Sequence, residues 1–129
     1  MKKILLALVA LLFCCGIEAN AQNIVKYTCT EAAMYVPGEG WSDWIKVNHS
    51  ITLNIANDTM IVSGESNVKY KLIDTTGERA TADGGVEYVM YGVDQFNEYC
   101  TIRAVVNADG SKQMYIEYDM QGTLVYNIK

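Results

Sequence analysis

Proline, histidine and basic clusters are scarce in this chain of 129 residues, and each scarcity excludes a class of protein. Pro37 is the single proline, whereas aromatic and β-branched residues are plentiful, which excludes collagen-like and disordered chains. His49 is the single histidine, and Cys29 and Cys100 lack the short spacing of zinc ligands, so no metal site and no cofactor are predicted. Acidic residues outnumber basic ones by 15 to 10 without any lysine- or arginine-rich run, which argues against nucleic acid and anionic lipid as partners.

The N-terminus has the pattern of a bacterial export signal. Two lysines precede an unbroken apolar run over Ile4–Phe13, and Ala19-Asn20-Ala21 is a small-x-small cleavage site. We therefore predict a signal peptide over residues 1–21 and a single mature domain over residues 22–129, with a net charge of −6. The apolar run is shorter than the about 20 residues that span a bilayer, so membrane insertion is not predicted. The product is expected to be periplasmic or secreted.

Four cysteines divide between the predicted signal and the mature domain. A lipid anchor on Cys14 or Cys15 would require small residues before the cysteine, and Leu12-Phe13 precedes Cys14, so a cleaved signal fits better. In an oxidising compartment Cys29 and Cys100 form a disulfide or remain as buried small core residues, and the sequence leaves both alternatives open. Neither has a histidine or a basic residue immediately beside it, as a catalytic thiol would.

Apolar residues alternate with polar ones along almost the whole mature chain. The clearest case is residues 45–56, which predict a half-buried antiparallel strand with a bend near Asn48-His49. The same period of two predicts further strands within residues 25–35, 59–63, 68–72, 86–91, 100–106, 114–118 and 124–128. No stretch sustains the 3.6-residue period of a helix.

Turn sequences separate these strands. Asn57-Asp58 predicts a two-residue hairpin turn with both residues at positive φ. Asp74–Gly85 is predicted to be a twelve-residue polar loop, and it includes Arg79. About eight strands joined by tight hairpins predict an all-β antiparallel meander closed into a barrel, with a two-sheet β-sandwich as the alternative.

No arrangement of side chains identifies an active site. A nucleophile elbow, a phosphate-binding glycine loop and a calcium loop are all missing from the sequence. The carboxylates lie mainly at turns and on polar strand faces, and His49 falls on the apolar face of its strand, where a core or bend histidine would lie. We therefore predict a protein that is not an enzyme, and a small hydrolase is the least favoured alternative.

Aromatic residues are the set best suited to binding. Trp41 and Trp44 lie three residues apart where a glycine-containing loop meets a strand. If the loops cluster at one barrel mouth, Trp41, Trp44 and Arg79 are the predicted contacts of a small ligand. The alternative is a protein–protein interaction or inhibitor module that uses the sheet surface around Val89 and Tyr91, where both strand faces are apolar.

Several loose patterns resemble known proteins. They are the signal ending at residues 19–22, the Trp41/Trp44 pair, the strand at residues 51–55, and the closing segments 115–118 and 125–128. With these the chain resembles the small exported all-β proteins of unknown function from gram-negative gut-type bacteria. Its general shape is also similar to the calycin-type barrels of lipocalins and avidins, although Gly38-Glu39-Gly40-Trp41 does not meet the lipocalin Gly-x-Trp spacing. The resemblance implies an exported β-barrel and supplies no catalytic or ligand-binding residue.

Overall fold

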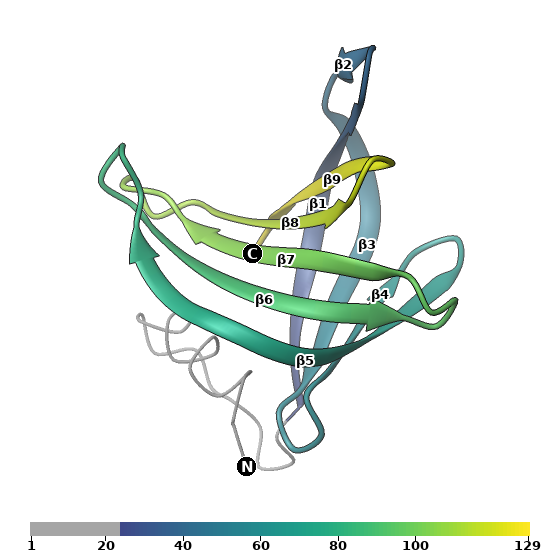
Figure 1. The fold of residues 1–129 in the computed structure, drawn as a ribbon. Helices are drawn as coiled ribbons and strands as arrows, with labels where there is room; N and C mark the ends of the chain where they lie inside the picture. Colours follow the sequence, from purple (N-terminus) through teal and green to yellow (C-terminus); the bar gives the residue numbers. More distant parts are fainter. Residues whose placement is uncertain (1–23) are drawn as a thin grey trace.

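A computed structural model describes residues 24–129, which form nine β-strands and no helix (Figure 1). The strands are β1 (Ile24–Val36), β2 (Gly40–Trp41), β3 (Ile45–Asn54), β4 (Thr59–Ser63), β5 (Asn67–Ala80), β6 (Val86–Asp94), β7 (Tyr99–Val106), β8 (Lys112–Tyr118) and β9 (Gly122–Ile128). The predicted signal peptide lies outside the described residues. Within residues 24–129, no helix is long and apolar enough to cross a membrane.

Eight of these strands close into an antiparallel barrel. From β3 to β9 each strand pairs with the next, and β1 pairs with β3 on one side and with β9 on the other. The two-residue strand β2 is an extension that pairs with the end of β1. The predicted closed meander is confirmed, and the pairing of the first strand with the last excludes the two-sheet sandwich.

Large side chains fill the middle of the barrel. Alternate residues on the strands point inward, as a half-buried strand requires, and an eight-stranded barrel is narrow enough for such side chains to fill it. The fully buried members of this core include Tyr27, Ile51, Leu53, Met60, Met90, Ile102, Met114 and Ile116. Cys29 and Cys100 belong to the same core as free thiols, so of the two alternatives the structure contains the buried small core residues and no disulfide.

The connection after β3 differs from the predicted two-residue turn. β3 ends at Asn54 and β4 begins at Thr59, and only Asp58 of the expected pair has a positive φ, of 52°. The connection is longer because Ile55 turns back into the core and the backbone N–H of Ala56 donates to Asn54 Oδ1 at 3.1 Å. The burial of Ile55 therefore outweighs the local preference of Asn57-Asp58 for a two-residue turn.

The predicted polar loop over Asp74–Gly85 is wrong, because most of it is strand. β5 continues to Ala80, which pairs with Val86, and only residues 81–85 form the connection. Two β-bulges, between Leu72 and Asp74 and between Thr75 and Gly77, interrupt the alternation of side chains. They explain why the sequence of this segment does not have the pattern of a strand.

Connections alternate between the two ends of the barrel, as they must in an antiparallel meander. We call one end the tryptophan end, because residues 37–44, 64–66, 95–98 and 119–121 connect strands there and include Trp41 and Trp44. Residues 55–58, 81–85 and 107–111 form the connections of the opposite end.

Candidate functional site

A pocket of about 590 Å³ opens at the tryptophan end, and we call it the mouth pocket. Its walls come from three neighbouring strands and from the loop between β1 and β3. The pocket is lined by Ala32, Ala33, Met34 and Val36 of β1, Ile45, Val47 and His49 of β3, Leu124 and Tyr126 of β9, and Glu39, Gly40, Trp41, Ser42 and Asp43 of the segment between β1 and β3. Most of these side chains are apolar, so the pocket extends the barrel core to the surface.

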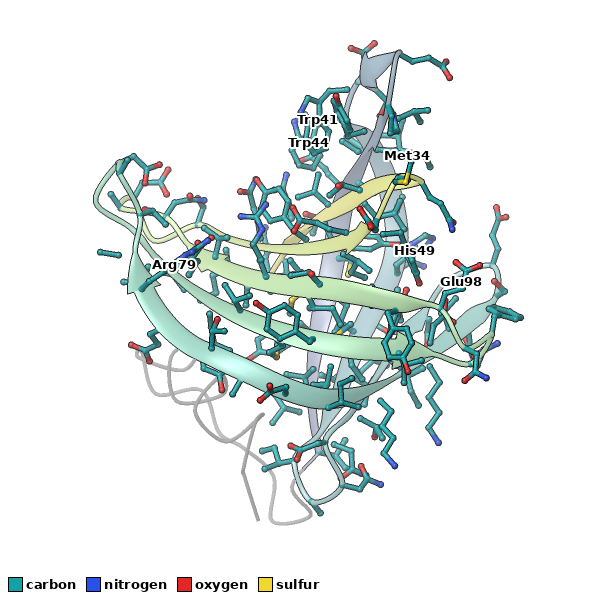
Figure 2. All side chains as sticks on the ribbon, in the orientation of Figure 1. Met34, Trp41, Trp44, His49, Arg79 and Glu98 are labelled. Atoms are coloured by element: carbon teal, nitrogen blue, oxygen red, sulfur yellow. The ribbon has the colours of Figure 1, made fainter. Side chains whose placement is uncertain are left out.

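The pocket is open because the strands differ in length. β4 pairs with β3 only from Ser50 to Asn54, so residues 45–49 of β3 have a paired strand on the β1 side alone. Ile45 is consequently 60% exposed, although its place in the alternating pattern predicted a buried side chain. Figure 2 shows Met34, which is also exposed, and His49 near the base of the β1–β2 extension.

His49 is the polar side chain that the strands contribute to the mouth pocket, whereas Glu39, Ser42 and Asp43 line it from the loop between β1 and β3. Its ring centroid lies 5.9 Å from that of Tyr126, and its Nδ1 is buried and has no hydrogen-bond partner among the described residues. The ring also lies so close to Gly64 that a Cβ atom there would be 2.6 Å from the imidazole. The apolar-face position predicted for His49 is thus confirmed, while its place in a pocket depends on the short β4 and could not be predicted.

Trp41 and Trp44 lie together on the outer wall of the barrel. The ring centroids of Trp41 and Tyr35 are 5.4 Å apart, and the two tryptophans line a small hollow above Tyr115 and Val125. Trp41 also lines the rim of the mouth pocket, whereas Trp44 is not among its wall residues. The two predicted tryptophan contacts are therefore neighbours, but only one of them reaches the mouth pocket.

Arg79 does not join the tryptophans. It lies at the end of β5, beside the opposite end of the barrel, and Figure 2 shows it far from Trp41 and Trp44. Its Nε forms an ion pair with Glu87, to which Arg103 also donates, from Nη1, at 3.0 Å. The predicted grouping of Trp41, Trp44 and Arg79 at one mouth is therefore not formed.

Arg79 is instead part of a charged network on the outer wall. Arg103 bridges Glu87 and Glu117, the second at 2.9 Å, and its guanidinium carbon lies 4.4 Å from the centre of the Tyr115 ring. Glu87 is only 6% exposed. Burial alone would raise the pKa of Glu87, but the hydrogen bonds from Arg79 and Arg103 outweigh burial and lower that pKa below its ordinary value.

A second buried carboxylate, Asp94, closes the turn between β6 and β7. Its Oδ1 accepts the backbone N–H groups of Phe96 and Glu98 at 2.9 and 3.0 Å, and the Tyr118 hydroxyl donates to Oδ2 at 2.9 Å. Burial favours a higher pKa for Asp94, but these hydrogen bonds stabilise the charged form more and lower the pKa. The carboxylate holds the turn and the Tyr118 side chain in place through these hydrogen bonds, which is a structural role.

The described residues contain no cluster of three or more histidine, cysteine or carboxylate side chains that could hold a metal ion. Burial raises the pKa of the Cys29 thiol and of the Cys100 thiol to about 12, so both are protonated at neutral pH.

The molecule is thus a closed eight-stranded antiparallel barrel with an apolar pocket at one end. No protein-family model, curated protein or solved structure matches the chain.

Proposed function

We propose that this protein is an exported, non-enzymatic β-barrel that binds a small, largely apolar molecule in the mouth pocket. The observation that carries the proposal is that apolar side chains of three strands stay uncovered at one end of an otherwise filled barrel. Exposed apolar surface is unfavourable in water, and a largely apolar concavity with few polar groups is the usual form of a small-molecule site. The export pattern at residues 1–21 supports a role outside the cytoplasm.

Met34, Ile45 and Trp41 are the proposed apolar contacts, because they are exposed and line the pocket. His49 is the proposed polar contact, because its imidazole lines the pocket among apolar side chains of the three strands. A ligand that joins an apolar body to one hydrogen-bonding group fits this set. Trp44 is an outer neighbour of the site, and Arg79 is assigned to the wall network instead.

Titration with the neutral fluorescent probe N-phenyl-1-naphthylamine tests the proposal. Ile45→Glu places a charge in the pocket and is expected to raise the dissociation constant of the probe at least about tenfold. Ile73→Glu is the matched control, because Ile73 on β5 is 50% exposed and does not line the mouth pocket. Equal probe binding by the two variants would refute binding in the mouth.

Trp41→Ala separates contact from packing. Trp41 is 55% exposed, so its removal is expected to weaken probe binding while leaving the thermal midpoint almost unchanged. A large fall in the midpoint would assign the side chain to packing.

A second candidate function is partner binding on the outer wall near Val89 and Tyr91. Val89 is only 5% exposed, but Tyr91 lines an open hollow together with Tyr99 and Met120. This hollow favours a surface that recognises another macromolecule. Sedimentation at several protein concentrations tests whether that macromolecule is a second copy of the chain, in which case Tyr91→Ser would remove the association.

A further inference from the structure

Exposed apolar side chains are concentrated at the tryptophan end. Of the nine large apolar residues exposed among residues 24–129, eight lie there and only Ile73 lies elsewhere. Five of the eight do not line the mouth pocket, and we call them the outer rim: Tyr35, Trp44, Phe96, Tyr99 and Met120. A molecule bound in the mouth pocket would leave the outer rim uncovered. Exposed apolar side chains gathered at one end of a domain are typical of an interaction site.

Met120 is the most informative member of the outer rim. It is 89% exposed, and its φ of 63° lies in the left-handed region that side chains other than glycine, asparagine and aspartate rarely adopt. Asn97 has nearly the same conformation, with a φ of 67°, in the neighbouring turn and is a residue suited to it. Methionine at this position thus strains the backbone and exposes an apolar side chain without a compensating contact in the barrel core. These costs are explained if the exposed side chain binds something.

The charges at this end complement one kind of partner. Its connections contain Glu39, Asp43, Glu65, Glu98 and Asp119 but no lysine or arginine, and Lys46 and Lys69 lie near the start of the adjoining strands β3 and β5. Within residues 24–129 none of these five carboxylates accepts a hydrogen bond or forms an ion pair. At the opposite end, Asp83 and Asp109 accept hydrogen bonds from Thr81 and Ser111 of their own turns. Among residues 24–129, most exposed large apolar side chains therefore lie at the same end as these five unpaired carboxylates.

We infer that the tryptophan end docks a basic, amphipathic segment of a polypeptide partner. The apolar side chains of that segment contact the outer rim, and its lysines or arginines pair with the surrounding carboxylates. A second copy of this chain would bring the same five carboxylates and be repelled, and an anionic lipid surface would be repelled likewise. A zwitterionic bilayer would cover the rim but would offer the carboxylates no excess of positive charge.

A peptide titration tests this inference on the mature domain. The probe is an amphipathic helix built of leucine and lysine with no aromatic residue, and the matched control replaces every lysine with glutamate. Trp41 and Trp44 are the only tryptophans of the chain, so their fluorescence reports on this end alone. The lysine peptide is expected to shift the emission to shorter wavelength in a saturable manner, and the glutamate peptide is expected to have no effect. Equal binding of both peptides would overturn the inference.

Charge variants locate the binding surface. Glu98→Gln with Asp119→Asn removes two charges from the tryptophan end and is expected to weaken peptide binding at least about fivefold. Asp58→Asn with Glu78→Gln removes the same charge elsewhere and is expected to change the affinity less than about twofold. Equal weakening by the two pairs would mean that only the net charge of the protein attracts the peptide.

Met120→Asn gives the sharpest outcome, because stability and docking should change in opposite directions. Asparagine suits the left-handed turn, so the denaturation midpoint is expected to rise, while peptide affinity falls with the lost side chain. Unchanged affinity in this variant, or binding of zwitterionic vesicles without binding of the peptide, would overturn the inference. Ile45→Glu is expected to bind the apolar probe more weakly and the peptide unchanged. The proposal for the mouth pocket and the proposal for the outer rim can therefore fail independently.

Discussion

His49 and Gly64 depend on each other at the base of the mouth pocket. The imidazole occupies the volume that any larger residue at position 64 would need, with 2.6 Å from an ideal Cβ to both Cδ2 and Nε2. Atoms of a real Cβ do not approach a ring this closely, so the glycine is required by packing rather than by backbone conformation. The position of the His49 ring in the pocket wall is therefore fixed by a close contact with the connection between β4 and β5.

Gly64→Ala is expected to destabilise the protein by about 1–3 kcal/mol, because either the imidazole or the backbone of the β4–β5 connection must move. Urea denaturation of Gly64→Ala, His49→Ala and the double variant measures the coupling between the two sites. When His49 is already replaced by alanine, Gly64→Ala should lower the free energy of unfolding much less than it does in the wild-type protein. A Gly64→Ala protein as stable as wild type would contradict the close contact.

The two core thiols are expected to be unreactive in the folded protein. Cys29 and Cys100 are buried and free, and burial raises the pKa of each thiol to about 12, so almost no thiolate is present near pH 7. A thiol reagent such as dithionitrobenzoate should label neither cysteine until the domain is unfolded, and reduction should leave the intact mass unchanged. A gain of about two hydrogen masses on reduction would show a disulfide and contradict this arrangement.

At the scale of elements, β6 joins the core to the charged outer wall. Its inward residues Tyr88 and Met90 are buried in the core, and its outward residue Glu87 receives hydrogen bonds from Arg79 of β5 and Arg103 of β7. Three adjacent strands are thereby connected across the wall by side chains as well as by backbone. A carboxylate this buried must be paired to remain charged.

Glu87→Gln is expected to lower the free energy of unfolding by about 2 kcal/mol, because two guanidinium groups lose a charged acceptor while Arg79 can still be solvated. Glu78→Gln on the neighbouring strand is the control and should change stability by less than about 0.5 kcal/mol, since Glu78 is exposed. Chemical denaturation at neutral pH compares the two. Equal effects would mean that the wall network contributes nothing to stability.

Strand periodicity could be predicted from the sequence wherever one face meets the core and the other meets solvent. Residues 100–106 and 114–118 alternate regularly, and both fall within the bounds of β7 and β8. Periodicity does not reveal the second half of β5, because two bulges shift its inward positions and because it carries Asp74, Glu78 and Arg79. These charged residues are typical of a loop and led to the loop prediction, although Arg79 lies on a strand and forms an ion pair with Glu87.

For the whole molecule, barrel closure could be anticipated but the site could not. Consecutive hairpins predict a meander, and a meander of about eight strands has the right number to close. The mouth pocket arises because β4 is shorter than β3, and no local sequence pattern indicates this difference in strand length. Trp41 lines this pocket, whereas Arg79 lies beside the opposite end, because connections alternate between the two ends of an antiparallel meander.

Acid is expected to destabilise the barrel. Asp94 and Glu87 have lowered pKa values in the folded protein, so at low pH the unfolded chain takes up protons first and is favoured. Their contribution to stability is present above the ordinary carboxyl values near pH 4 and is lost as the pH falls through the lower folded values. Thermal midpoints measured from pH 7 to pH 3 should fall steeply below about pH 4. Asp94→Asn should be less stable at pH 7 and show a shallower fall, and a midpoint that stays constant down to pH 3 would contradict this role.

Native mass spectrometry of the protein purified gently from its own source tests the central claim, that the mouth pocket holds a small apolar molecule. We expect a bound mass that denaturation releases from the wild-type protein and from Ile73→Glu but that is missing from Ile45→Glu. The same bound mass on Ile45→Glu, or a wild-type spectrum that contains only the bare chain, would contradict it.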